Sequence, residues 1–262
     1  EKEEVSLEEA CRKYLSLYSE KELKSKYTFS INLPHLIDAL QDTIRYGNIK
    51  LKNYKKVYSD EDVIQFSVVT LVLPDGSLVL SFSGTDGSIT GWKENLMMTY
   101  SKDLPCQILA KDYVKETIAD IPETSYLFGL KKKKVYPKMY LTGHSKGGNL
   151  AMYAYLKNPK LQGYIEGVKS FDGPGFADGF WQGDEDVSKI TNYIPKDSIV
   201  GRVLDHREQT KVLDAQGSGL VQHDTLMWSV DIKDFNYCDA LTKESDDLLE
   251  YVNKLLLSLI HI

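Results

Sequence analysis

The chain of 262 residues has few cysteines and no long apolar run. Its three cysteines, Cys11, Cys106 and Cys238, are widely spaced, so neither a disulfide framework nor a Cys-x-x-Cys metal or redox site is expected, and a reducing compartment fits best. No stretch of 18 residues is continuously apolar, so no transmembrane segment is expected. The first residues, EKEEVSLEEA, are acidic and polar, whereas a signal peptide is basic and then apolar. We therefore expect a cytoplasmic protein, with secretion left open because the sequence does not begin with Met.

The sequence also lacks an excess of basic residues. It has 32 Lys and Arg against 38 Asp and Glu, a formal net charge of −6, so nucleic acid is not an expected partner. The one dense basic run, Lys131 to Lys134, is too local to bind nucleic acid, and we interpret it as a solvated loop. Neither a metal nor a cofactor is expected. The oligomeric state stays open.

The order of patterns along the chain predicts an α/β protein with an N-terminal helical extension. The stretch SLEE, from residue 6, is typical of a capping box that opens a helix to about residue 18, and Asn32 followed by Pro34 opens a second helix. From residue 65, two β-branched runs flank Pro74-Asp75-Gly76, which predicts a hairpin, and a helical stretch is expected around residues 107–119. The further strand and helix patterns alternate, which predicts a mostly parallel central sheet with helices on both faces. We expect residues 1–48 to form an extension packed on the core and residues 49–262 to form one domain.

The stretch YLTGHSKGGNLA places Ser145 between Gly143 and Gly147. An apolar run precedes the serine and a small-residue helical pattern follows it, so Ser145 is expected at the tip of a sharp strand-to-helix turn, the context of a nucleophile elbow. Glycine is required on both sides because a Cβ atom there would collide with the neighbouring strand or helix. The Lys146 backbone N–H then points toward any oxyanion that forms on the substrate. This pattern predicts acyl transfer; the alternative is a glycine-rich turn with a surface serine.

An activated serine needs a base and an acid that orients the base, and in this fold the acid precedes the histidine in the chain. His223, in the glycine-containing stretch GSGLVQHD, is favoured as the base over His206, which lies in a strand-and-turn pattern. His144 is interpreted as structural, because adjacent side chains diverge on a sharp turn. Asp197 follows the predicted strand ITNYIP, and Asp172 follows the strand before it. We predict Asp197 as the acid, because a carboxylate one strand farther from the nucleophile is usual.

With these residues in place, the chain resembles the class-three lipases and, more closely, a bacterial family of lipase-like α/β-hydrolase domains, over about residues 50 to 235. The stretches LTGHSKGGNLA, SFDGPGF and IPKDSIVGRVL are similar to the lipase elbow, the segment after the next strand and the acid-bearing loop. SFSGTDGSITGW is similar to the lipase loop that supplies the second oxyanion donor, which would be the Thr85 backbone N–H beside that of Lys146. Lys146 stands where lipases usually have Leu.

The expected function is hydrolysis of a carboxylic ester or thioester through an acyl-enzyme on Ser145, with His223 as base and Asp197 as the orienting acid. The expected partner is a small-molecule acyl ester or a lipid-like substrate. Two alternatives stay open: a peptidase or acyltransferase that uses the same triad, and a catalytically silent binding module that keeps the elbow as scaffold. Met97, Met98 and Tyr100 belong to a lid over the site or to a helix packed on the core.

Overall fold

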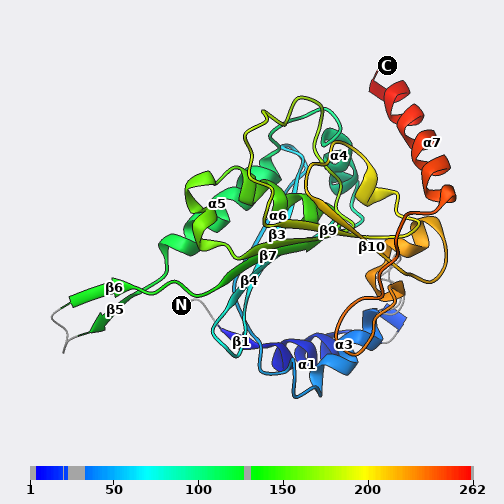
Figure 1. Cartoon of the computed structure of the whole chain (residues 1–262). Coiled ribbons are helices and arrows are strands. Elements are labelled where there is room, and N and C mark those ends of the chain that lie inside the picture. Colours follow the sequence, from blue (N-terminus) through cyan, green and yellow to red (C-terminus); the bar gives the residue numbers. More distant parts are fainter. Residues whose placement is uncertain (1–3, 20, 23–32, 127–130, 261–262) are drawn as a thin grey trace.

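A large mixed β-sheet crosses the protein in the computed structural model, which describes residues 4–19, 21–22, 33–126 and 131–260 (Figure 1). In these ranges the sheet has eight strands in the order β1-β2-β3-β4-β7-β8-β9-β10. Their bounds are β1 Val5–Ser6, β2 Lys50–Ser59, β3 Ile64–Val72, β4 Leu78–Phe82, β7 Met139–His144, β8 Gly167–Phe171, β9 Ile190–Pro195 and β10 Gln209–Leu213. Pairing is antiparallel from β1 to β4 and parallel from β4 to β10.

Helices lie on both sides of the sheet (Figure 1). On one side, α5 (Pro105–Ala119) and α6 (Lys146–Leu156) pack on each other and on the central strands, and α4 (Ile89–Met97) packs on β3. On the other side lie α1 (Leu7–Leu17) and α3 (Leu33–Gln41), which contact each other. The chain ends with α7 (Lys243–Ile260). This is the predicted α/β-hydrolase fold, a mostly parallel central sheet with helices.

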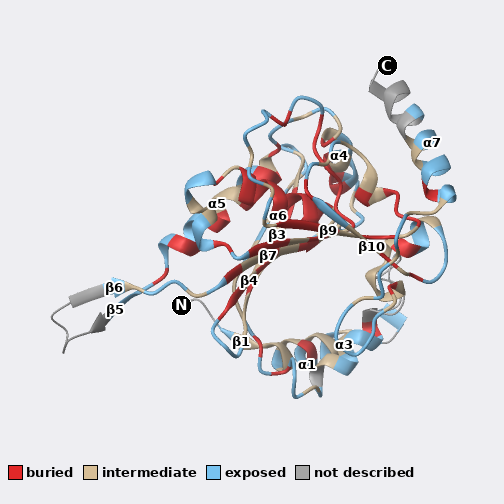
Figure 2. Cartoon of the chain, in the orientation of Figure 1, coloured by how far each residue is buried: buried red, intermediate tan, exposed pale blue. Residues whose placement is uncertain are grey.

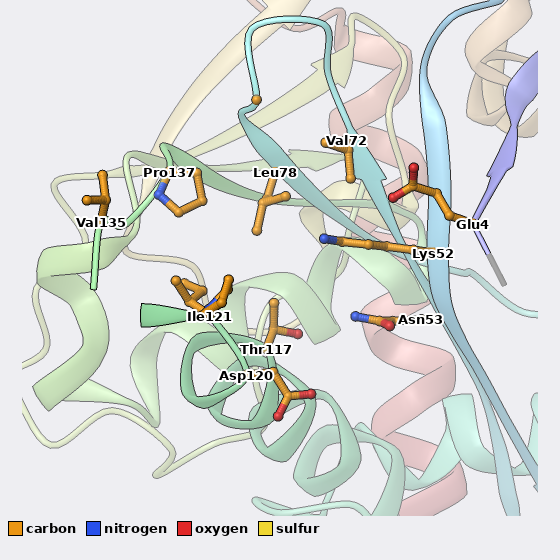
Figure 3. Close-up of a pocket in the computed structure, with 12 residues that line it drawn as sticks. Glu4, Lys52, Asn53, Val72, Leu78, Thr117, Asp120, Ile121, Val135 and Pro137 are labelled. Atoms are coloured by element: carbon orange, nitrogen blue, oxygen red, sulfur yellow. The ribbon is translucent and has the colours of Figure 1, made fainter. Parts of the chain in front are cut away.

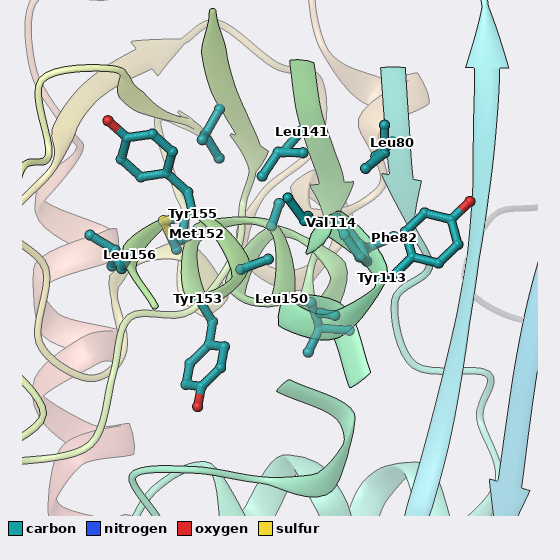
Figure 4. Close-up of a cluster of buried hydrophobic side chains, with 14 of the residues drawn as sticks. Leu80, Phe82, Tyr113, Val114, Leu141, Leu150, Met152, Tyr153, Tyr155 and Leu156 are labelled. Carbon is teal, nitrogen blue, oxygen red and sulfur yellow. The ribbon is translucent and has the colours of Figure 1, made fainter. Parts of the chain in front are cut away.

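The core is centred on α6, in which every residue is buried (Figure 2). Apolar side chains from α5, α6 and the central strands meet there (Figure 4). They include Leu80, Phe82, Val114, Leu141, Leu150 and Tyr155. Since full burial of one large apolar side chain contributes about 1.5–3 kcal/mol, this cluster holds the elbow helix firmly against the sheet.

Several predicted local signals are confirmed. Ser6 and Glu9 form a reciprocal capping box at the start of α1. The Pro-Asp-Gly turn joins β3 to β4 as an antiparallel hairpin, with Gly76 at φ 82°, a conformation that glycine adopts readily. The second helix is present as α3, although the proposed cap Asn32 lies outside the described residues. The expected position of helix 107–119 matches α5.

Two segments differ from the sequence-based expectation. Lys131–Lys134, interpreted above as a loop, forms β6, which pairs antiparallel with β5 (Glu123–Tyr126) in a separate two-stranded sheet. β2 was not predicted at all, because its sequence KLKNYKKVYS is rich in lysine. It pairs along its length with β3 and has a bulge between Lys52 and Lys55, where Asn53 has φ 54°.

The extension contributes to the main sheet through β1, which pairs with Lys50 and Leu51 of β2. The division of the chain after residue 48 stays a prediction. Among the described residues, no helix is both long and apolar enough to cross a membrane.

Candidate active site

Ser145 lies between the end of β7 and the start of α6, with φ 57° and ψ −129°. A positive φ is strained for any residue that carries a Cβ, so it persists only where the surrounding structure enforces it. One constraint is a hydrogen bond from the Ser145 N–H to the Phe171 carbonyl of β8, at 2.9 Å. The predicted elbow geometry at Ser145 is therefore confirmed.

The two glycines that flank the serine allow the backbones of β4, β7 and α6 to approach closely. A Cβ atom on Gly143 would overlap the backbone of Gly147. A Cβ atom on Gly147 would overlap the carbonyl group of Phe82 at the end of β4. Neither position has room for a side chain. This is the reason for the two glycines that we inferred from the sequence.

Asp172 and His223 form the candidate acid–base pair. The His223 Nδ1–H donates to Asp172 Oδ2 at 2.6 Å. Asp172 Oδ1 accepts two further hydrogen bonds, from the Ser198 hydroxyl at 2.5 Å and from the Gly201 N–H at 3.1 Å. The Asp172 side chain is 1% exposed and that of His223 is 22% exposed. A buried carboxylate with all these donors holds one imidazole nitrogen and leaves Nε2 as the nitrogen that can take a proton.

The prediction that Asp197 lies at the His223 ring was wrong. Asp197 instead binds the residue before the histidine: its Oδ2 accepts from Gln222 Nε2, and its backbone N–H donates to Gln222 Oε1, both at 2.9 Å. Its Oδ1 accepts from the Thr242 hydroxyl at 2.5 Å. Both aspartates follow strands, but Asp172 turns out of β8 with φ 51°, which directs its carboxylate to the histidine.

His144 and His206 have structural contacts instead. The His144 Nε2–H donates to the His223 backbone carbonyl at 2.7 Å, and the two rings lie 4.5 Å apart between centroids. Burial, together with the nearby His223, lowers the pKa of His144 to about 4, so His144 is neutral at pH 7. His206 contacts Glu208 through Nδ1 at 2.6 Å and the Val203 carbonyl through Nε2 at 3.1 Å. The structure thus brings His223, rather than His206, to the elbow.

The loop that carries Thr85 lies directly against the elbow. A Cβ atom built on Gly84 would lie 3.5 Å from the Ser145 Cβ. Thr85 is partly exposed, and its hydroxyl donates to the Asn95 side chain at 3.0 Å. The Lys146 N–H belongs to the first residue of α6, where no earlier turn of helix supplies an acceptor. Both predicted oxyanion donors are therefore in segments next to the serine.

Comparison with known protein families finds a match over most of the chain. Residues 40–260 match the family described as Mbeg1-like. The chain belongs to the Mbeg1-like family. This match and the fold bear out the expected relationship to lipase-like α/β-hydrolases.

Among solved structures, a lipase from Rhizopus microsporus var. chinensis is 12% identical, with a TM-score of 0.46 over 94% of this chain and 85% of that one. M37 lipase is 20% identical, with a TM-score of 0.35 over 70% of each chain. An arylesterase is 11% identical, with a TM-score of 0.30 over 95% of this chain and 96% of that one. No curated protein matches the chain.

The Lys146 side chain of this Mbeg1-like protein points into the interior. It is 1% exposed, and its ammonium group donates to the Gln65 backbone carbonyl and to Gln65 Oε1, both at 2.6 Å. It also forms an ion pair with Glu94, whose side chain is fully buried. The cation therefore does not face the substrate side of the elbow. Glu94 and Gln65 were missed by the sequence analysis because neither lies in a recognisable motif. Ser198 and Gly201 were missed although they lie in the stretch IPKDSIVGRVL, because that stretch was interpreted through Asp197.

Two cavities lie near the sheet of this Mbeg1-like protein. One, of about 440 Å³, is at the amino ends of β4 and β7 (Figure 3). Its lining includes Lys52, Asn53, Leu78, Thr117, Val135 and Pro137. The other, of about 350 Å³, is lined partly by His144, Phe171, Thr225 and Trp228. None of the candidate triad residues lines either one. Within the described ranges, no group of three or more His, Cys, Asp or Glu side chains could hold a metal ion.

Proposed function

We propose that this protein is a serine hydrolase that cleaves a carboxylic ester or thioester through an acyl-enzyme. The observation that carries the proposal is the buried Asp172–His223 pair at a strained serine elbow. Perturbed backbone and a buried, hydrogen-bonded acid–base pair at one point of a fold are typical of catalytic sites.

In the proposed reaction, His223 Nε2 takes the hydroxyl proton of Ser145 as Oγ attacks the carbonyl carbon. Asp172 holds the imidazole in the tautomer that protonates at Nε2 and stabilises the imidazolium. The backbone N–H groups of Lys146 and Thr85 stabilise the negative oxygen of the tetrahedral intermediate. The imidazolium then protonates the leaving alcohol or thiol, and water, deprotonated by the same imidazole, releases the acyl group as a carboxylic acid and restores the serine.

Exposed apolar side chains on the segments that adjoin the Thr85 loop and His223 in the chain favour an apolar acyl group. Exposed apolar residues lie on and just after α4, which follows the Thr85 loop, and in the 3-10 turn η3 (Gly219–His223), which ends at the base. These residues are Ile89, Trp92, Leu96, Tyr100, Leu220 and Val221. An ester with a short or medium aliphatic acyl chain would cover some of this surface on binding.

The test is reaction with a fluorophosphonate probe and hydrolysis of p-nitrophenyl esters of increasing acyl length. The folded wild type should be labelled at Ser145 and should hydrolyse the short esters. Ser145→Ala should abolish both, and His223→Ala should slow labelling by about 10²-fold or more, because the hydroxyl then keeps its proton. His206→Ala is the matched histidine control and should change little, since His206 contacts Glu208 rather than the elbow.

Two results would overturn the proposal. A folded wild type that resists the probe, or a His223→Ala variant that is labelled as fast as the wild type, would favour a binding module that keeps the elbow only as scaffold.

A further inference from the structure

The buried ion pair of Lys146 and Glu94 joins the elbow to the loop of Thr85. Lys146 is the residue after the nucleophile, and Glu94 lies on α4, the helix that follows the Thr85 loop. Asn95, the next residue on α4, binds the Thr85 hydroxyl through its side chain. The ion pair therefore connects one oxyanion donor with the helix that anchors the other.

Gln65 of β3 strengthens this connection from a third element. Its carbonyl and its side-chain oxygen both accept from the Lys146 ammonium group. Its side-chain NH₂ donates to the Gly84 carbonyl at 3.4 Å, and its backbone N–H donates to Glu94 Oε1 at 3.4 Å. A primary ammonium group has three N–H donors, and here the three acceptors come from two residues at fixed positions. The ammonium group thus has one arrangement in which every donor is satisfied.

Stability alone does not account for an ion pair at this place. Removing two charges from water costs several kcal/mol per ion, and well-packed apolar residues of similar volume are often as stabilising or more so. The charged pair also fixes the distance between α4 and the start of α6, because its hydrogen bonds have narrow ranges of length and angle.

We propose that the side chains of Lys146 and Glu94 are positioning residues that set the separation of the two oxyanion donors, the backbone N–H groups of Thr85 and Lys146. This rests on the proposed serine hydrolase function. The Lys146 N–H is placed by α6 and the Thr85 N–H by the loop before α4, and nothing covalent joins these segments near the site. The buried pair supplies that link, with Gln65 as its second anchor.

The test is the double variant Lys146→Met with Glu94→Leu, which replaces the pair by apolar side chains of similar size. Its melting temperature should fall, because the buried Gln65 carbonyl and side-chain oxygen lose their donor, so urea unfolding must first show that the variant is folded. Its kcat on a p-nitrophenyl ester should fall by about 10- to 100-fold with little change in KM, because an error of about 1 Å in an oxyanion donor acts on the transition state.

A second readout separates oxyanion positioning from a general loss of structure. A thionoester carries sulfur in place of the carbonyl oxygen, and sulfur is a weak hydrogen-bond acceptor. The wild type should therefore prefer the oxygen ester strongly, and the double variant should lose much of this preference. The matched control is Lys55→Met with Glu116→Leu, which removes a surface pair at 3.2 Å that is not in the site and should leave both rates unchanged.

Each outcome decides the proposal. A folded double variant with wild-type kcat and the wild-type ratio of ester to thionoester rates would overturn it, while the proposed hydrolase function would stand. A wild type that hydrolyses neither substrate would overturn both. If the double variant does not fold, Glu94→Gln keeps the shape of the side chain, and an unchanged ester-to-thionoester ratio in that variant would overturn the positioning role.

Discussion

Asp172→Asn should inactivate the protein far more than Asp197→Asn does. In the wild type, Asp172 Oδ1 accepts from the Ser198 hydroxyl and the Gly201 N–H, and Oδ2 accepts from His223 Nδ1–H. An asparagine that keeps the first two bonds must place its carbonyl oxygen at the Oδ1 position. Its NH₂ group then faces His223 Nδ1, which must become an acceptor, so the ring carries its proton on Nε2 and cannot take one from Ser145.

The expected size of this effect is about 10⁴ in kcat, the loss that follows from a wrong imidazole tautomer when the site is otherwise intact. Asp197→Asn should instead cost about 1–3 kcal/mol of stability, because one acceptor for the Gln222 amide or the Thr242 hydroxyl is lost at a buried position. Its kcat should fall by less than about 10-fold, since Asp197 acts on His223 only through Gln222.

The assay is hydrolysis of p-nitrophenyl butyrate, with urea unfolding of each variant to show that it is folded. The reasoning fails if Asp197→Asn, folded, loses more activity than Asp172→Asn, or if the two losses are equal. Ser198→Ala removes one of the two donors to Asp172 Oδ1 but leaves the carboxylate at His223. It should therefore lower kcat less than Asp172→Asn does.

Two further predictions concern the elbow. Gly143→Ala should lower the free energy of unfolding, measured with urea, by about 2–4 kcal/mol, because its Cβ would overlap the Gly147 backbone. The control is Gly163→Ala, which should cost less than about 1 kcal/mol because no atom lies within 4 Å of the added Cβ. Equal costs for the two variants would contradict the close packing inferred at Gly143. His144, with a pKa of about 4 when folded against an ordinary 6.5, stays neutral while the unfolded chain takes a proton. The stability contributed by this group should therefore be complete above pH 6.5 and should fall by about 3 kcal/mol between pH 6.5 and pH 4. His144→Gln should remove that part of the pH dependence, and a variant that keeps the wild-type dependence would exclude this cause.

The elbow could be predicted from sequence because its causes are local. Two glycines two residues from a serine, after an apolar run and before a helical pattern, specify the turn and the close approach of three backbones. His223 could also be predicted, since the competing His206 lies in a strand-and-turn pattern. The evidence for Ser145 and for His223 lies within a few residues of each in the sequence.

The carboxylate that contacts the His223 ring could not be predicted, because the choice between Asp172 and Asp197 depends on contacts across the fold. Each follows a strand, and the order of residues does not say which carboxylate turns toward the loop of His223. The donors that hold Asp172 are 26 and 29 residues away in the chain. β2 also could not be predicted from local sequence. Its lysines are not typical of a strand, and it forms one through its pairing with β3.

The lysine-rich strand β2 has features that oppose edge-to-edge pairing with another molecule. β1 covers only its first two residues, so most of its outer edge could recruit a strand from another molecule. On the uncovered part of this edge, Lys52, Lys55 and Lys56 oppose such pairing by charge repulsion, and the bulge near Asn53 opposes it by breaking the hydrogen-bond register. Replacing these lysines with apolar residues to raise strand propensity should therefore favour edge-to-edge pairing between molecules.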